Sequence, residues 1–326
     1  MDFKIIGLTK SINSIEKFKL YLPKLFLMKY LVFLVVYPVL WCVSILPFRL
    51  LYLLSDFVFF IVYYIIGYRK KIVRANIALA LPNLSLKERL IIEKKSFQHM
   101  SDMFLEMIKT ITISKTEINK RYTYSNLDLY KEFEAKQKSM AVMIAHYASY
   151  EWVISLNHQM TFKGFAIYKK LNNPYFDKLV IDIRSKFKAY LITTKDTIPT
   201  IESNFKNNIL SSYGFASDQS PRLSVTHYWR KFMGIQTNVH TGAEMLAKKY
   251  DLNVIFIKTR KVKRGYYEGT FVILSDDAKN VPDYQITDKF LDLVEQQIYE
   301  APEFYLWTHK RWKHRPEDQK KIETVI

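Results

Sequence analysis

The stretch MAVMIAHYASYE, residues 140–151, decides the fold that we predict for this chain. Its first six residues form a continuous apolar run, which is typical of a strand covered on both faces of a parallel sheet. His146 directly follows that strand, and Glu151 comes five positions later. In open α/β sheets, functional sites form beyond the carboxyl ends of the strands. We therefore expect a buried central strand with a site at its end.

Short apolar runs alternate with helical patterns after this stretch. Further strands are expected at residues 162–168, 190–193, 213–217, 253–259 and 270–274, and helices at 151–156, 174–186, 198–207, 241–249 and 287–300. Such alternation predicts an α/β fold with a largely parallel sheet flanked by helices. Before it, residues 72–112 are predicted to be helical, with a break at Pro82 and a restart at a capping box formed by Ser85 and Glu88.

Two apolar runs precede the helical region. Residues 30–46 contain no charge, and residues 50–66 contain only Asp56. A helix that spans a bilayer needs about 20 apolar residues, and 17 is near the lower limit. Three arrangements stay open: one spanning helix and one interfacial helix, a re-entrant hairpin, or a helical pair buried in a soluble core. A cleaved signal peptide is not expected, because no small-residue cleavage site follows the first run.

Basic residues flank both runs. Five lysines lie between residues 10 and 29, and the sequence YRKK occupies residues 68–71. Under the positive-inside rule, the second cluster keeps the chain after it in the cytoplasm. The predicted organisation is a membrane anchor region, residues 1–75, and a cytoplasmic domain, residues 76–326, with a helical lead-in (76–125) and an α/β core (126–326).

The composition narrows the class of partner. The 326 residues include 49 Lys and Arg against 31 Asp and Glu, a net charge of +18, and 15% are aromatic. This surface favours nucleic acid, acidic lipid headgroups or an acidic protein. The single cysteine, Cys42, excludes an internal disulfide and a cysteine-based zinc site. The sequence also has no glycine-rich phosphate-binding motif.

His146 and Glu151 are the candidate catalytic residues. A neutral imidazole can take a proton from a hydroxyl near pH 7, and a carboxylate on its other nitrogen fixes the tautomer and stabilises the imidazolium. The five-residue spacing is not evidence by itself, because a histidine followed by an acidic residue at this spacing is expected by chance among seven histidines. The position at the end of a buried strand favours a catalytic dyad. The alternative is a histidine that packs or caps a helix.

Other groups are candidates for substrate binding. Asp218 and Gln219 stand in a polar turn after a predicted strand, and this turn shares an edge with His146 if the strands are parallel. Arg184, near the end of helix 174–186, could bind a phosphate or a carboxylate. The alternative for each is a solvated surface residue.

Two basic segments are ambiguous at this stage. Residues 307–315 interleave aromatic and cationic side chains, and residues 258–264 form a second cationic cluster. Each could be a nucleic-acid stripe, an interfacial anchor or a docking patch for an acidic carrier protein.

In order along the chain, these features resemble the lipid A biosynthesis acyltransferases, the late acyltransferases that add secondary acyl chains to lipopolysaccharide precursors. The motifs that carry the resemblance are the apolar run 30–46, residues 68–71 with Asn76, the H-x4-E motif His146–Glu151, Tyr168 with Asn173, Pro174 and Arg184, Asp218 with Gln219, residues 232–234, and residues 302–307 with Lys310 and Arg311.

The resemblance implies a fold like that of the glycerol-phosphate acyltransferases and an inner-membrane enzyme with a cytoplasmic active site. It implies acyl carrier protein as the thioester donor and an anionic glycolipid as the acceptor. His146 would be the general base and Glu151 its orienting partner, with Arg184, Asp218 and Gln219 near the substrate. No metal or other cofactor is expected, because a thioester is already activated.

One departure from the family pattern concerns the acceptor. Ala148, Ser149 and Tyr150 stand where family members commonly have Gly-Asn-Trp. An acyltransferase for another membrane lipid, such as an aminolipid or a lysophospholipid, is therefore the alternative. A membrane-anchored nucleic-acid binder is a second class, but it leaves the order of the motifs unexplained. We expect no nucleic-acid partner.

Overall fold

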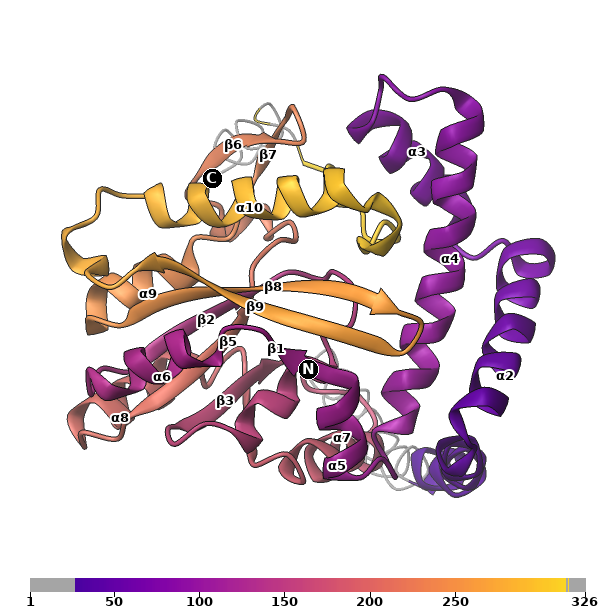
Figure 1. Ribbon diagram of the computed structural model, residues 1–326, viewed down its shortest axis with the longest axis horizontal. Coiled ribbons are helices and arrows are strands. Elements are labelled where there is room, and N and C mark those ends of the chain that lie inside the picture. Colours follow the sequence, from indigo (N-terminus) through magenta and orange to yellow (C-terminus); the bar gives the residue numbers. More distant parts are fainter. Residues whose placement is uncertain (1–26, 315, 317–326) are drawn as a thin grey trace, which may run out of the picture.

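The computed structural model describes residues 27–314 and residue 316. Its centre is a seven-stranded sheet (Figure 1) with the strand order β1-β9-β8-β2-β5-β3-β4. The strands are β1 (Tyr122–Tyr124), β2 (Met140–Ile144), β3 (Lys163–Tyr168), β4 (Ala189–Thr193), β5 (Ser211–Ala216), β8 (Asn253–Lys263) and β9 (Tyr266–Ser275).

Strand β2 is the buried centre that the apolar run predicts. Met140, Ala141 and Met143 are fully buried, and β2 pairs in parallel with β5 on one side and β8 on the other. The strands β5, β3 and β4 continue this parallel arrangement. Strand β9 runs antiparallel to its neighbour β8, and β1 pairs in parallel with β9, so β1 and β9 both run opposite to the other strands of this sheet. The predicted α/β fold with a mixed, largely parallel sheet is confirmed.

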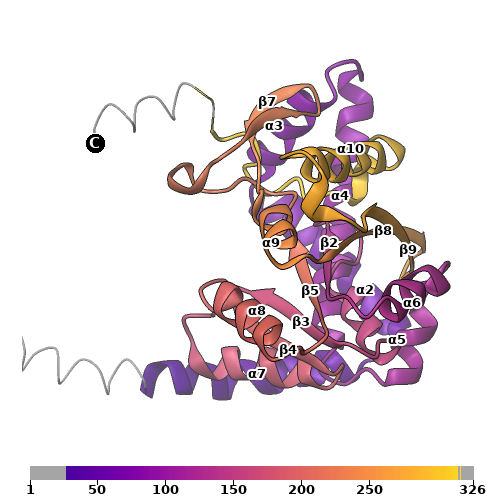
Figure 2. The same ribbon diagram turned by 90° about the vertical axis from the view of Figure 1, so that its left-hand side faces the viewer.

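Helices cover both faces of this sheet. In Figures 1 and 2, α10 lies above the hairpin of β8 and β9 and α6 lies below it. The helices are α2 (Phe48–Phe60), continued by a π-helical turn (Ile61–Ile66), α3 (Lys70–Ala80), α4 (Leu86–Lys109), α5 (Lys115–Arg121), α6 (Leu127–Ala135), α7 (Pro174–Ser185), α8 (Thr197–Lys206), α9 (Gly242–Tyr250) and α10 (Gln285–Glu300). The predicted capping box begins α4, where Ser85 Oγ accepts from the backbone N–H of Glu88.

Two helices at the start of the described chain are long and apolar enough to cross a membrane. They are Leu27–Ile45 and the continuous helical segment Phe48–Ile66, and only 6% and 17% of their most apolar windows are buried. This exposure argues against a helical pair inside a soluble core. The chain turns at Pro47, so the two helices point in different directions (Figures 1 and 2). In a re-entrant hairpin the two helices would instead lie antiparallel.

One face of α2 is fixed to the rest of the molecule. Ser55 Oγ donates to the Asp102 carboxylate at 2.8 Å, and Tyr52 OH donates to Glu106 at the same distance. Asp56, the one charge in its apolar run, forms an ion pair with Arg264 at 2.6 Å. The other face of α2 exposes large apolar side chains. This pattern is typical of a helix that lies at a membrane surface.

Both basic segments that the sequence left ambiguous make contacts within the fold. In the C-terminal segment, Trp307, Arg311 and Trp312 are buried. They pack beside a small hairpin that the sequence reading missed, β6 (Trp229–Phe232) and β7 (Ile235–Asn238), whose turn has positive φ at both Met233 and Gly234, as a type I′ turn requires. Arg315 lies outside the described residues.

In the cationic cluster of residues 258–264, four of the five cations form ion pairs within the chain, and Lys263 lies over the ring of Tyr266. Lys258 binds Glu300, Arg260 binds Glu268, and Lys261 and Arg264 bind Asp102. These ion pairs leave the cluster with less charge for an outside partner than the sequence suggests.

Candidate active site

The parallel register of β2 and β5 brings the central polar pair together. Ile144 of β2 lies opposite Ala216 of β5, so the residues two positions beyond each strand are neighbours as well. These are His146 and Asp218. The Asp218 carboxylate oxygen Oδ1 lies 2.7 Å from His146 Nδ1 and accepts the His146 backbone N–H at 3.0 Å.

This geometry fixes the chemistry of the imidazole. Asp218 is fully buried, and its Oδ2 accepts a hydrogen bond from the Gln219 side chain at 3.0 Å. The carboxylate therefore holds the proton of the neutral imidazole on Nδ1, which leaves Nε2 as a proton acceptor. The His146 side chain is 24% exposed.

Charge and burial act in opposite directions on His146. Burial lowers its pKa, but the adjacent Asp218 charge, the Asp218 hydrogen bond and the charge of Glu151 more than offset this, so the pKa of His146 lies above its ordinary value. Burial raises the pKa of Asp218, and its contacts with His146 lower it to below the ordinary value. The pair thus favours an ionised carboxylate beside an imidazole of raised basicity.

Glu151 has a different partner from the one that the sequence suggested. Its carboxylate accepts from Arg184 Nη2 at 2.8 Å, and both side chains are about four-fifths buried. We expected Glu151 to accept the hydrogen bond of His146 Nδ1, and Asp218 accepts it instead. The reason is the register: residues that follow adjacent strands meet directly, whereas Glu151 lies beyond a turn and starts the 3₁₀-helix Trp152–His158.

A segment near the C-terminus supports the loop after β2. The backbone N–H of Ala148 donates to Phe304 O at 2.9 Å, and that of Leu306 donates to His146 O at 3.1 Å. Ala148 has a φ of +49°, in the left-handed region that favours glycine. This position is the one where the resembled family commonly has glycine, so the structure gives a backbone reason for that residue.

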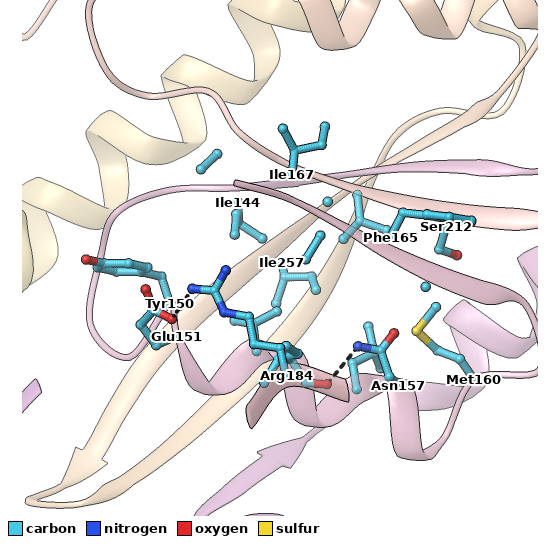
Figure 3. Close-up of a pocket in the computed structure, with 18 of the residues that line it drawn as sticks. Ile144, Tyr150, Glu151, Asn157, Met160, Phe165, Ile167, Arg184, Ser212 and Ile257 are labelled. Atoms are coloured by element: carbon cyan, nitrogen blue, oxygen red, sulfur yellow. Dashed lines mark hydrogen bonds and ion pairs between the residues drawn. The ribbon is translucent and has the colours of Figure 1, made fainter. Parts of the chain in front are cut away.

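An apolar cavity of about 200 Å³ opens beside this pair; we call it the catalytic cavity. Tyr150, Glu151 and the Arg184 guanidinium lie at one end, and Asn157, Met160 and Ser212 lie at the other (Figure 3). His146 belongs to the first end, because its ring centroid is 5.0 Å from that of Tyr150, and Gly164 lies against the Asn157 side chain at the second. Alternate residues of β5 form part of its floor. From Ala216 to Ser212 the strand covers roughly 13 Å at about 3.3 Å per residue.

Small side chains create the space for this cavity. Gly164 and Ala166 of β3 and Gly214 and Ala216 of β5 face the same side of the sheet and all line the cavity. Larger residues at these alternate positions would fill it. The sequence SSYGFA, residues 211–216, has a small residue at every second position, Ser212, Gly214 and Ala216. This pattern indicates the cavity, but we did not predict it from the sequence.

The structure brings four of the five predicted site residues together in two pairs, His146 with Asp218 and Glu151 with Arg184, and Gln219 donates to Asp218. Both pairs meet at the catalytic cavity, which His146, Glu151 and Arg184 line. Fold and site together define an α/β enzyme that places an imidazole–carboxylate pair beside a mostly apolar cavity, an arrangement suited to an acyltransferase.

Comparison with known proteins gives the family. Residues 19–314 match the bacterial lipid A biosynthesis acyltransferases, so the chain belongs to this family and is an acyltransferase. It is 25% identical over 281 residues to the lipid A biosynthesis lauroyltransferase of Escherichia coli (strain K12), a match that covers 86% of this chain and 90% of the relative. It is 22% identical over 259 residues to the lipid A biosynthesis palmitoleoyltransferase of the same organism, with 76% and 80% covered.

Proposed function

We propose that this acyltransferase moves a fatty acyl chain from the thioester of acyl carrier protein to a hydroxyl of a lipid A precursor. The observation that carries the proposal is the hydrogen bond between His146 Nδ1 and Asp218 Oδ1 at the mouth of the catalytic cavity. The family and its named relatives support a lipid A acceptor.

In the proposed reaction, His146 acts as the general base. Its Nε2 takes the proton of the acceptor hydroxyl as the hydroxyl oxygen attacks the thioester carbonyl carbon. The tetrahedral intermediate then collapses, the C–S bond breaks, and the imidazolium returns the proton to the carrier thiolate. The products are an ester and a free thiol, so no oxidant or metal enters the balance. Asp218 stabilises the imidazolium between these two steps.

In this proposal the catalytic cavity holds the acyl chain of the donor. Its lining is mostly apolar, and burial of each methylene is worth about 0.8 kcal/mol. Its far end, at Met160 and Ser212, would limit chain length. Glu151 holds the Arg184 guanidinium at the near end, where the thioester and the polar part of the acceptor would meet.

We further propose that the enzyme works at the inner membrane with its active site on the cytoplasmic side. The two exposed apolar helices and the basic residues 68–71 after them support this location. The net charge of +18 suits an acidic carrier protein and anionic lipid headgroups. The division into an anchor region, residues 1–75, and a cytoplasmic domain, residues 76–326, stays a prediction.

The test is acyl transfer from radiolabelled acyl carrier protein to a panel of acceptors: a lipid A precursor, an aminolipid and a lysophospholipid. We expect the lipid A precursor to be the preferred acceptor. Preference for one of the other two lipids would reassign the acceptor and keep the reaction. Transfer to none of them would contradict the proposal.

A further inference from the structure

A second apolar cavity, of about 230 Å³, lies on the other side of the ion pair of Glu151 and Arg184. Eleven of its fourteen lining residues are apolar, and only Thr110, Glu151 and Arg184 are polar. Helix α7 forms one wall through Leu179, Val180 and Ile183. We call it the membrane-side cavity, because Leu40 of the first apolar helix also lines it.

This cavity is a built part of the fold. Lys186, at the end of α7, donates to Thr110 O at 3.1 Å and so joins two of its walls. At the start of α7, Asn173 Nδ2 donates to Lys29 O at 3.0 Å, and the rings of Phe33 and Phe176 meet edge to face at 5.2 Å. The first apolar helix is therefore fixed along α7 (Figure 2), and its Leu40 lines the cavity.

The two cavities meet at a single polar junction. Glu151, Ile154 and Arg184 line both of them, and His146 lines the catalytic cavity next to Glu151. A chain in each cavity would thus bring two polar ends together beside the imidazole. The reaction needs this arrangement, because it joins an acyl donor to an acceptor that is itself a lipid.

We propose that the membrane-side cavity binds an acyl chain of the lipid acceptor, while the catalytic cavity holds the chain of the donor. This inference rests on the proposed function. The membrane-side cavity lies beside a helix that could cross the bilayer. This position favours the acceptor as the occupant, since a membrane lipid can extend a chain into the cavity without leaving the bilayer. The Glu151–Arg184 ion pair then separates the two chains and faces the polar part of the acceptor.

The test compares Michaelis constants for the two substrates, a lipid A precursor in mixed micelles and lauroyl-loaded acyl carrier protein. Val180→Phe narrows the membrane-side cavity and displaces one or two methylenes of a bound chain. It should raise KM for the lipid about tenfold and leave KM for the donor within about twofold. Ile181→Phe is the control, since Ile181 is on the same helix but lines neither cavity. Ala166→Leu narrows the catalytic cavity and should change the donor constant.

A second variant guards against misfolding of the first. Leu171 is exposed at the rim of the membrane-side cavity, so Leu171→Glu places a charge there with little effect on the core. It should raise KM for the lipid, and Ile198→Glu, at an exposed residue that lines neither cavity, should not.

Some outcomes would overturn the inference. An unchanged KM for the lipid in both Val180→Phe and Leu171→Glu would show that the acceptor chain does not bind in this cavity. A raised KM for the donor in Val180→Phe would show that the donor chain binds there instead. If the wild-type enzyme transfers acyl groups normally, these results contradict only the cavity assignment. A wild-type enzyme that acylates no lipid would contradict the proposed function as well.

Discussion

At the scale of single residues, the arrangement of the site follows from where two strands end. The sequence places polar residues at the same distance beyond β2 and β5, and the parallel register makes His146 and Asp218 neighbours. The sequence reading identified the shared edge but assigned the orienting contact to Glu151. Nothing in a single sequence gives the register of two strands that are about 70 residues apart, so the choice between the two carboxylates required the structure.

Asp218→Asn tests which carboxylate orients the imidazole. The amide keeps the shape but removes the charge that raises the pKa of His146. Because the base must be neutral, wild-type kcat/KM should fall as the pH drops through the raised pKa of His146. In Asp218→Asn this acid limb should move to lower pH, and kcat should fall about 10²- to 10⁴-fold.

Glu151→Gln is the matched comparison for Asp218→Asn. Glu151 acts on His146 only through its charge, so its loss should move the acid limb in the same direction by less and should reduce kcat about tenfold. A larger effect of Glu151→Gln than of Asp218→Asn on both quantities would show that Glu151 is the orienting residue.

Ala148→Gly tests the strain in the loop after β2. A residue with a side chain at a φ of +49° costs about 1–2 kcal/mol, of which the greater freedom of glycine in the unfolded chain offsets a part. Ala148 is also fully buried, so the loss of its methyl group costs about 0.8 kcal/mol and offsets a further part of the relieved strain. Ala148→Gly should therefore change the free energy of unfolding by less than about 1 kcal/mol, measured by denaturant unfolding in detergent, and destabilisation by more than about 2 kcal/mol would contradict the left-handed conformation.

At the scale of elements, helix α4 joins α2 to the sheet through one buried acid. Glu106 accepts hydrogen bonds from Tyr52 OH of α2 and Tyr267 OH of β9, both at 2.8 Å. Burial raises the pKa of Glu106 to about 7, although Lys261 and the two hydroxyl donors lower it. The sequence predicted α4, but it gave no sign of this contact because the partners are 54 and 161 residues away.

This acid predicts a pH dependence of stability. Between its ordinary pKa of 4.5 and about 7, the folded state keeps a proton on Glu106 that the unfolded state has released. The free energy of unfolding should therefore fall as the pH rises through this window. In Glu106→Gln the fall should be smaller, which denaturant titrations at pH 5 and pH 8 would detect. An equal fall in both proteins would contradict the raised pKa.

The elements themselves were the most predictable part of the fold. Apolar runs bounded by polar turns identified β2, β3, β4, β5, β8 and β9, and the capping box placed the start of α4. We did not predict that β8 and β9 form one antiparallel hairpin. An apolar pattern is the same whichever direction the strand runs, so it cannot show this. It also missed β6 and β7, whose short polar strands have no alternating apolar pattern.

At the scale of the whole molecule, exposed apolar surface is concentrated on the two N-terminal helices, whereas many of the charges are paired within the fold. The composition predicted an anionic partner, but it could not show that the aromatic and basic C-terminal segment belongs to the core. Partners such as Asn76, which donates to Trp307 O at 2.8 Å, are more than 200 residues away in the sequence.

Membrane contact can be mapped with a polarity-sensitive fluorophore on single cysteines in a Cys42→Ser background. Probes at Val35 and Leu53, which are 71% and 65% exposed, should report an apolar environment in bilayers, since both helices contact lipid. A probe at Leu86, which is 64% exposed at the start of α4, should report water. A water-like signal at Leu53 would contradict a membrane-surface role for α2.

The central claim, that His146 removes the proton from the lipid hydroxyl, is tested most directly by the turnover number of His146→Ala. The measurement is the rate of transfer from lauroyl-loaded acyl carrier protein to a lipid A precursor, both saturating, with the fold checked by circular dichroism. We expect kcat to fall about 10²- to 10⁴-fold while the fold is kept. A folded His146→Ala enzyme that turns over within a few-fold of the wild type would contradict the account.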